Sequence, residues 1–226
     1  MKNNLKLGVL GGMGTYATIV FMNLLHELKN AECDQENINM IVTNNSSIPD
    51  RTSYILGNNN LSPLEFLKKD IEILENGECN LIALTCNTAH YWYNELVNFS
   101  KVPIINMLNL VSKKVHTLNV KKVGLLATRG VIKSNIYSNY LTNIEVFVSD
   151  NYIQDLIDKL IYDKVKKNKK VSIEEINSLL YYFKSNGCDC VIFGCTELSV
   201  IKYNLKINDE YIVDSLEELA KYIVNI

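Results

Sequence analysis

Short apolar runs alternate along the chain with longer stretches in which apolar residues recur at helical spacing. The short runs predict eight buried strands. They occupy residues 5–10, 39–43, 80–84, 103–106, 122–126, 144–146, 189–193 and 211–213. Strands that alternate with helices are typical of βαβ units, so the sequence predicts an α/β fold with parallel sheets.

The longer stretches predict helices, and one of them has a distinct start signal. Ser62 is the expected N-cap, Pro63 occupies the first helical position and Glu65 completes a capping box. Residues 44–60 form a polar stretch that is too long for a simple connection, and loops of this length are often functional. Other helices are predicted at residues 15–28, 151–166, 173–185 and 215–224.

Two segments in the first half of the chain have counterparts in the second half. Residues 7–14 (LGVLGGMG) resemble residues 123–130 (VGLLATRG), and residues 81–88 (LIALTCNT) resemble residues 190–196 (CVIFGCT). Chance similarity between apolar strands is one explanation. The shared order favours the other, which is two similar Rossmann-like or flavodoxin-like α/β domains related by a pseudo-twofold axis.

The length of 226 residues fits one large domain or two small ones. Together with the internal similarity, it predicts a first domain at residues 1–100 and a second at residues 101–211. The final helix, at about residues 212–226, is expected to cross back to the first domain.

The composition is that of a globular protein, with 47% hydrophobic and 21% charged residues. A net charge of −2 without long basic runs argues against a nucleic-acid partner. No segment approaches the roughly 18 consecutive apolar residues of a membrane helix, and the first residues lack the features of a signal peptide. The six cysteines are therefore expected to be reduced thiols in the cytoplasm.

Two cysteines, Cys86 and Cys195, stand out by their positions. Each ends a predicted strand, where parallel sheets place ligand-binding residues, and each precedes a predicted helix, whose positive end favours the thiolate. If a pseudo-twofold axis relates the two halves, these thiols face each other across a cleft. Short polar residues follow both, as Asn87-Thr88 and Thr196-Glu197. Burial as small apolar residues is the expected role of the others, Cys33, Cys79, Cys188 and Cys190.

Cofactor and metal sites are alternatives that the sequence disfavours. Residues 12–17 fit a loose dinucleotide-binding glycine motif, but uncharged residues follow the second strand where an acidic ribose ligand is required. The glycines still allow a small anion to meet backbone N–H groups, which makes Met13 and Gly14 candidate ligand-binding residues. The spacing of the last three cysteines is not a zinc-ligand pattern, so we expect no metal site.

Three further residues have more than one interpretation. His90 lies one helical turn beyond Cys86. Its possible roles are to tune the Cys86 thiolate, to bind a substrate carboxylate, or simply to form a hydrogen bond with a local carbonyl. Arg51 lies in the long polar stretch, where its position favours a solvated side chain, although a bidentate clamp on a carboxylate is the alternative. Lys166 ends a basic helix, where it complements the helix dipole or binds an anion.

Four motifs together resemble one known family. They occur in family order over nearly the whole chain, as Gly11-Gly12-Met13-Gly14-x-x-Ala17-Thr18, Pro49-Asp50-Arg51-Thr52, Cys86-Asn87-Thr88-Ala89-His90 and Gly194-Cys195-Thr196-Glu197. Each is weak alone, but the ordered set resembles the aspartate/glutamate racemase family. The resemblance implies two similar α/β domains with the active site in the cleft between them, no cofactor, and a homodimer.

The resemblance also implies roles for single residues. Cys86 and Cys195 transfer protons on opposite faces of the substrate α-carbon. Glu197 stands where dedicated glutamate racemases carry histidine, and Asn168 replaces a glycine that often follows Lys166. The implied substrate ligands are Asn87, Thr88, Thr128 and Thr196 for the α-carboxylate and amino group, and Arg51 and Lys166 for the side-chain carboxylate. The implied supporting residues are Asp50, His90 and Glu197.

We therefore predict a cofactor-independent racemase that interconverts L- and D-aspartate, with glutamate as a further candidate substrate. The expected partner is a small amino acid. One alternative is another reaction on the same scaffold, such as dicarboxylate isomerisation or decarboxylation, although two cysteines disfavour a single-cysteine decarboxylase. The other alternative is a non-catalytic module that binds an amino acid.

Overall fold

The computed structural model describes residues 5–226, so residues 1–4 of the first predicted domain lie outside the described residues. The described chain forms two four-stranded sheets in which every pairing is parallel. The first sheet contains β1 (Lys6–Gly11), β2 (Asn39–Asn44), β3 (Leu81–Leu84) and β4 (Ile104–Ile105). The second contains β5 (Lys122–Ala127), β6 (Glu145–Phe147), β7 (Cys190–Gly194) and β8 (Ile212–Asp214).

The strand order confirms that the two halves are alike. It is β2-β1-β3-β4 in the first sheet and β6-β5-β7-β8 in the second, so each half uses its four strands in the same sequence. The predicted strands are all present, and no strand end differs from its predicted position by more than one residue. The predicted fold class, two α/β halves with parallel sheets, is therefore confirmed. The domain boundaries at residues 100 and 211 stay predictions.

Helices connect the strands and cover the sheets. No helix in the described part of the chain is long and apolar enough to cross a membrane. The α-helices are α1 (Thr15–Lys29), α2 (Arg51–Ile55), α3 (Leu64–Asn76), α4 (Tyr93–Phe99), α5 (Met107–Thr117), α6 (Arg129–Ser134), α7 (Asn151–Asp158), α8 (Ile173–Ser185), α9 (Thr196–Asn204) and α10 (Ser215–Val224). The first half also contains the short 3₁₀ helices η1 (Asp34–Glu36) and η2 (Thr88–Trp92).

The start of α3 differs from its prediction. The helix begins at Leu64 with Pro63 as its cap, and Ser62 Oγ accepts a hydrogen bond from the Leu64 amide at 3.3 Å. Glu65 does not complete a capping box, because its carboxylate pairs with Lys68 at 2.9 Å instead. The helix is thus assigned one residue later than predicted, although Pro63 already has helical backbone angles and the Ser62 hydroxyl accepts the expected capping hydrogen bond.

The single helix predicted at residues 151–166 is divided into three parts. After α7, the chain forms a π-helical turn, η3 (Lys159–Lys164), and then a 3₁₀ turn, η4 (Val165–Lys167). Asn168 ends this stretch with a φ of 52°, in the left-handed region that asparagine tolerates better than most residues. The wider π turn changes the direction in which the following side chains point, which decides where Lys166 lies.

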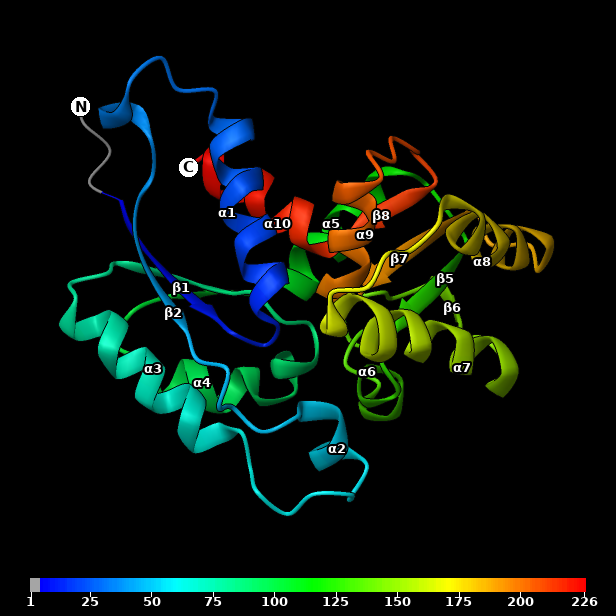
Figure 1. Ribbon diagram of the computed structural model, residues 1–226, viewed down its shortest axis with the longest axis horizontal. Coiled ribbons are helices and arrows are strands. Elements are labelled where there is room, and N and C mark those ends of the chain that lie inside the picture. The colour runs from blue at the N-terminus through cyan, green and yellow to red at the C-terminus, as the bar shows by residue number, and fades with distance from the viewer. Residues whose placement is uncertain (1–4) are drawn as a thin grey trace.

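The two halves share one hydrophobic core. This cluster includes Leu7 of β1, Phe21 of α1, Phe193 of β7 and Leu216 of α10. Figure 1 shows α1 and α10 side by side between the two sheets, and α10 also contacts α5 and α9. The C-terminal helix therefore packs against α1 of the first half and against α5 and α9, which come later in the chain than the first sheet.

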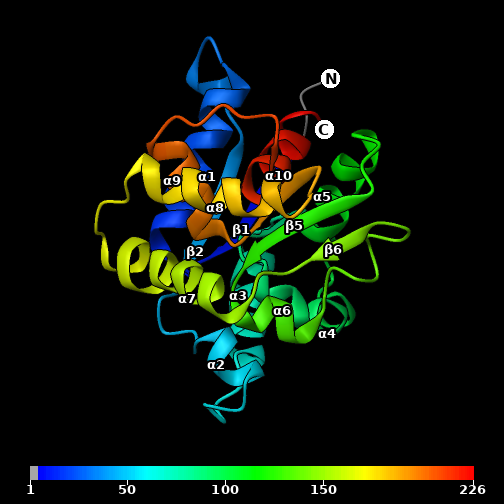
Figure 2. The ribbon, with the colours of Figure 1, turned by 90° about the vertical axis from the view of Figure 1, so that its right-hand side faces the viewer.

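The outer layers differ between the halves. The helices α3 and α4 lie below the first sheet in Figure 1, whereas α7 and α8 cover the side of the second half that faces the viewer in Figure 2. The helix α2 crosses to the second half and contacts α6. A Cβ atom on Gly130 of α6 would lie 2.9 Å from the Thr52 Cα atom, so this close approach requires glycine.

Candidate active site

A buried pocket lies where the carboxyl ends of four central strands meet. The chain reaches it just after β1, β3, β5 and β7, the two central strands of each sheet. Its lining comprises Met13, Asp50, Arg51, Thr52, Cys86, Asn87, Thr88, Thr128, Tyr162, Lys166, Cys195, Thr196 and Glu197. The residues singled out in the sequence therefore come together, except for Gly14 and His90, which do not line this pocket.

We call this pocket the inner pocket; its free volume is about 10 Å³, room for a single water molecule at most. A groove of about 690 Å³ lies next to it, and we call it the outer groove. Gly14 lines the outer groove at the start of α1, together with the exposed Tyr16. The walls that the two cavities share are formed by Met13, Asp50, Arg51, Lys166 and Glu197.

Cys195 forms a hydrogen bond within the inner pocket. Its thiol donates to Glu197 Oε2 at 2.9 Å, and both side chains are buried. Burial raises the pKa of the Cys195 thiol well above its usual value, and the negative charge of Glu197 raises that pKa further. Cys195 is the N-cap residue of α9, yet the helix end does not make it a thiolate, which corrects the expectation from sequence.

The turn that carries Cys86 is fixed by His90. The Cys86 carbonyl accepts a hydrogen bond from His90 Nδ1 at 2.8 Å, and His90 Nε2 accepts one from the Met107 amide at 3.1 Å. These two bonds assign the neutral tautomer with the proton on Nδ1. Burial lowers the pKa of His90 to about 4, so the ring stays uncharged at neutral pH. Of the sequence-based interpretations, the local carbonyl contact is the one present.

The two residues after Cys86 contact the second half of the molecule. Thr88 Oγ1 lies 3.1 Å from Thr128 Oγ1, and Thr128 caps α6 by accepting a hydrogen bond from the Val131 amide. Asn87 Nδ2 donates to Ser215 Oγ at 2.8 Å. The Cys86 turn is therefore attached to α6 and α10, although it belongs to the first sheet.

Arg51 is buried, which overturns the solvated side chain that its position in a polar stretch favours. Three backbone carbonyls accept hydrogen bonds from its guanidinium at 2.9 to 3.2 Å, those of Met13, Ile48 and Pro49. These carbonyls hold Nη1 and Nη2, whereas Nε has no hydrogen-bond partner within residues 5–226. The arrangement leaves one buried N–H donor beside the pocket and excludes a bidentate clamp in this conformation.

Lys166 bridges carboxylates from both halves. Its Nζ lies 3.8 Å from Asp50 Oδ2 and 3.7 Å from Glu197 Oε1. The same ammonium lies 4.7 Å from the centre of the Tyr162 ring, a cation–π contact. Because these groups belong to the wall between the inner pocket and the outer groove, Lys166 stands at the passage from one to the other.

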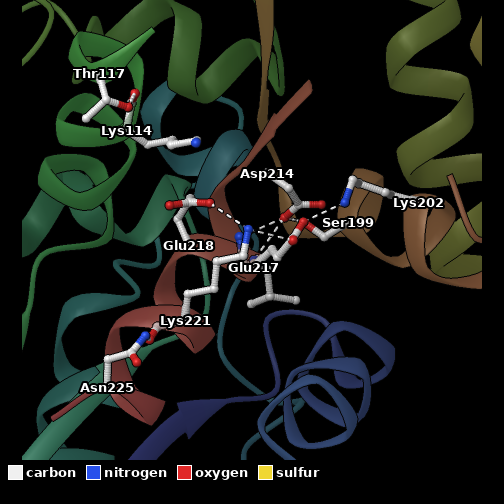
Figure 3. Close-up of polar contacts among 10 residues, drawn as sticks. Lys114, Thr117, Ser199, Lys202, Asp214, Glu217, Glu218, Lys221 and Asn225 are labelled. Atoms are coloured by element: carbon white, nitrogen blue, oxygen red, sulfur yellow. Dashed lines mark hydrogen bonds and ion pairs between the residues drawn. The ribbon is translucent and has the colours of Figure 1, made fainter. Parts of the chain in front are cut away.

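A polar cluster fixes the start of α10 behind the pocket. Asp214 Oδ1 accepts hydrogen bonds from Ser199 Oγ at 2.7 Å and from the Leu216 amide at 2.9 Å. Glu217 pairs with Lys202 of α9 and, at 2.8 Å, with Lys221. Figure 3 shows these side chains gathered where β8 leads into α10. The cluster holds the first turn of the helix whose first residue is Ser215.

Four residues of this region escaped the sequence analysis. Thr52 and Tyr162 line the inner pocket, and Tyr137 and Ser215 lie behind it, where both contact Asn87. Thr52 directly follows Arg51 in a motif that was recognised, so its place could have been inferred. Tyr162 lies four residues before Lys166, in the pattern Tyr162-x-x-Val165-Lys166, so its place could also have been inferred. Tyr137 and Ser215 lie outside the motifs.

The remaining cysteines are not at the site. Cys79, Cys188 and Cys190 are buried, as predicted, whereas Cys33 is exposed and the prediction of burial is wrong for it. Cys33 precedes the short turn η1 at the surface. Nowhere in the described part of the chain do three or more His, Cys, Asp or Glu side chains gather in a way that could hold a metal ion.

Comparison with known proteins places the chain among racemases. A family model described as Asp/Glu/Hydantoin racemase matches residues 10–223. The chain is similar to the structure of Picrophilus torridus aspartate racemase, with a TM-score of 0.85 and 31% identity, covering 98% of this chain and 94% of that one. An aspartate racemase homologue from Pyrococcus horikoshii OT3 has the same fold, with a TM-score of 0.75 and 22% identity over 100% and 98% of the two chains.

A similarity of sequence extends to a second kind of racemase. The broad specificity amino-acid racemase RacX from Bacillus subtilis (strain 168) is 29% identical over 154 residues, which are 67% of this chain and 66% of RacX. The match to the family model spans nearly the whole chain and agrees with the fold and with the motifs. The chain therefore belongs to the Asp/Glu/Hydantoin racemase family.

Proposed function

We propose that this protein is a cofactor-independent racemase that interconverts L- and D-aspartate, with Cys86 and Cys195 as its two proton-transfer residues. The observation that carries the proposal is the presence of both cysteines in one buried pocket. They follow β3 and β7, which occupy equivalent places in the two sheets. Two thiols approaching from different halves of the molecule suit a reaction that needs an acid and a base on opposite faces of one carbon.

The different surroundings of the two thiols assign their starting roles. Cys195 holds its proton, because burial and Glu197 raise its pKa, and it starts as the acid. Cys86 is then the base. Its thiolate takes the Cα proton, which leaves a carbanion, and the Cys195 thiol delivers its own proton to the opposite face. The product has inverted configuration, and the enzyme is left with Cys86 as thiol and Cys195 as thiolate, ready for the reverse direction.

The carbanion requires stabilisation, because the Cα–H group is a very weak acid. Hydroxyl and amide donors surround the inner pocket, among them Thr88, Thr128 and Thr196. Donors that are already positioned in a water-poor site stabilise developing charge without reorganisation. We assign them, with Asn87, to the α-carboxylate and amino group of the substrate.

The side-chain carboxylate of aspartate is assigned to Arg51 and Lys166. Arg51 Nε is a buried donor without a partner among the described residues, and Lys166 is the nearby ammonium. The inner pocket is too small for an amino acid while Lys166 bridges Asp50 and Glu197. Substrate entry from the outer groove then requires Lys166 to exchange these carboxylates for that of the substrate.

The proposal is tested by incubating the purified protein with L-aspartate in D₂O, without added pyridoxal phosphate. We expect deuterium at Cα and formation of D-aspartate at matching rates. L-glutamate and a panel of neutral and basic L-amino acids are run in parallel, because RacX is described as having broad specificity. Absence of both exchange and inversion with every amino acid would overturn the proposal.

Two other outcomes would identify the alternatives. Tight aspartate binding in calorimetry without isotope exchange would indicate a binding module. Release of carbon dioxide, or conversion of a dicarboxylic acid to an isomer that is not its enantiomer, would indicate another reaction on the same scaffold. Light scattering in the same buffer measures the oligomeric state, for which we propose a homodimer.

A further inference from the structure

We propose that Tyr137 and Ser215 are positioning residues that orient Asn87 and thereby align the turns that carry Cys86 and Cys195. This inference rests on the proposed racemase function. Neither residue lines the inner pocket, and both are buried, at 1% and 0% exposure. They contact Asn87 from two sides, and Ser215 also bonds to the β7 backbone at Phe193, so their influence on the reaction passes through these two contacts.

The hydrogen bonds fix the direction of every donor in this group. Ser215 Oγ donates its single hydrogen to the Phe193 carbonyl at 2.8 Å, so the same oxygen can only accept from Asn87 Nδ2. The nitrogen of the Asn87 amide must therefore face Ser215, and its oxygen must face Tyr137. Tyr137 Oη donates to that oxygen at 2.6 Å.

The Asn87 amide consequently has one orientation. A flipped amide would place its nitrogen against the Tyr137 hydroxyl and its oxygen against the Ser215 oxygen, whose hydrogen is already used. Burial raises the pKa of Tyr137, so its hydroxyl keeps the proton that it donates. In the observed orientation, one hydrogen of Nδ2 is held by Ser215, and the second remains as a donor for the substrate, which suits an oxygen anion.

The same bonds connect the two cysteine turns. Asn87 directly follows Cys86 in the chain, and Phe193 lies two positions before Cys195 in β7. Only two hydrogen bonds, through the Ser215 hydroxyl, separate the Asn87 side chain from the Phe193 backbone. Ser215 is in turn held by the first turn of α10, which Asp214 caps. We call this chain of hydrogen bonds, from Tyr137 through Asn87 and Ser215 to Phe193, the relay. The relay sets the position of one turn relative to the other.

Two-base inversion depends on such alignment, since both thiols must reach the same carbon from opposite sides. A misplacement of about 1 Å can cost about 100-fold in rate. A loosened Cys86 turn still allows one thiol to remove the proton and, after exchange with solvent, to return a deuteron to the same face. Loss of the relay should therefore reduce inversion more than it reduces isotope exchange.

The test uses Ser215→Ala and Tyr137→Phe, each of which removes one hydroxyl group of the relay. We expect each to lower kcat for racemisation about tenfold or more, to change KM less, and to raise the ratio of Cα deuterium exchange to inversion in D₂O. The matched controls are Ser112→Ala and Tyr140→Phe, whose hydroxyl groups bond outside the relay. The controls should keep the wild-type ratio.

A double-mutant cycle separates positioning from general destabilisation. In an Asn87→Ala background, Tyr137→Phe should cause little further loss, because its hydroxyl donates to Asn87. Ser215→Ala should cause a smaller loss than in the wild type, because only its bond to Phe193 is left to remove. Equal losses with and without Asn87, or an unchanged ratio of exchange to inversion, would overturn the inference. If Ser215→Ala does not fold, Tyr137→Phe, which only removes an oxygen, carries both measurements. An inactive wild type would instead overturn the proposed function.

Discussion

The turns that carry Cys86 and Cys195 occupy equivalent places in two similar halves, yet they are stabilised in different ways. The Cys86 turn is attached to distant elements by its own side chains: His90 accepts a hydrogen bond from the start of α5, and Asn87 donates one to Ser215 of α10. The Cys195 turn leads directly into α9, and its thiol is bound two residues further on by Glu197. One turn is fixed through its backbone and neighbours, and the other through the sulfur atom itself.

This difference separates two properties that a racemase needs. The Cys195 turn determines the protonation of its thiol, because Glu197 accepts a hydrogen bond from the S–H group and raises the pKa of Cys195. The Cys86 turn determines position, because within the described residues its hydrogen bonds involve the Cys86 carbonyl and the residues that follow, and none involves the sulfur. The two halves therefore repeat the same sheet, but the surroundings of Cys86 and Cys195 differ.

Removal of either sulfur is the change with the largest expected effect. Cys86→Ser and Cys195→Ser should each lower racemisation by about a thousandfold or more, since each loses one of the two proton-transfer groups. The remaining cysteine still exchanges the proton on its own face, so the two variants should exchange opposite enantiomers of aspartate in D₂O. Proton exchange is followed by NMR and inversion by chiral chromatography.

The exposed Cys33 supplies the control for these variants. Cys33→Ser should retain wild-type turnover, which shows that loss of a thiol is not harmful in itself. Wild-type racemisation by either site variant would contradict the two-base mechanism. Exchange of the same enantiomer by both variants would contradict the placement of the thiols on opposite faces.

His90 makes the stability of the protein sensitive to acid, and its expected effect on the free energy of unfolding is of intermediate size. Its folded pKa of about 4 lies below the unfolded value of about 6.5, so the folded state binds fewer protons between these values. Stability is complete above pH 6.5 and is lost as the pH falls toward 4. Between pH 7 and pH 5 this single group should lower the unfolding free energy by about 2 kcal/mol.

Urea unfolding at the two pH values measures this loss. His90→Gln has no titrating ring, so its unfolding free energy should change by about 2 kcal/mol less than that of the wild type between pH 7 and pH 5. The variant is compared with itself at each pH, which removes its own loss of packing from the comparison. Equal pH dependence in both proteins would show that His90 binds a proton as readily in the folded state as in the unfolded state.

Glu197→Gln is expected to have the smallest of these effects on turnover. Without the carboxylate, the pKa of Cys195 falls, and the thiol loses its proton at a lower pH. We expect kcat to fall about tenfold and the alkaline limb of the pH–rate profile to move to lower pH. Alkylation of Cys195 by iodoacetamide, followed by mass spectrometry, should also begin at lower pH.

A surface carboxylate provides the matched control. Glu65→Gln removes an exposed partner of Lys68, and such pairs contribute little to stability. Its pH–rate profile should coincide with that of the wild type. A Glu197→Gln profile that also coincides would show that Glu197 does not control the protonation of Cys195.

The position of the site could be predicted from the sequence, because it depends on a repeated pattern. An apolar strand that ends in a cysteine and a short polar residue occurs once in each half, and parallel strands place such residues at one edge of a sheet. Burial of Arg51 could not be predicted in the same way. It depends on three backbone carbonyls that meet only after β1 and the polar stretch have packed together.

The supporting residues were hidden for a related reason. Tyr137 and Ser215 are 50 and 128 positions from Asn87 in the chain, and neither lies in a local motif. The π turn at residues 159–164 has no signal in apolar spacing either, because it widens a helix whose pattern is otherwise continuous. Long-range hydrogen bonds and the exact pitch of a helix are decided by tertiary packing.

The hydrophobic core shared by both halves limits how the protein can move. Many two-lobed enzymes bend at a hinge so that their lobes separate as rigid bodies. Here any motion that separated α1 from α10 would open the shared core, which includes Phe21 and Leu216, and the cost of exposing apolar surface to water opposes it. Substrate entry and product release are therefore expected to depend on rearrangements of single side chains and short segments, while α1 and α10 stay packed together.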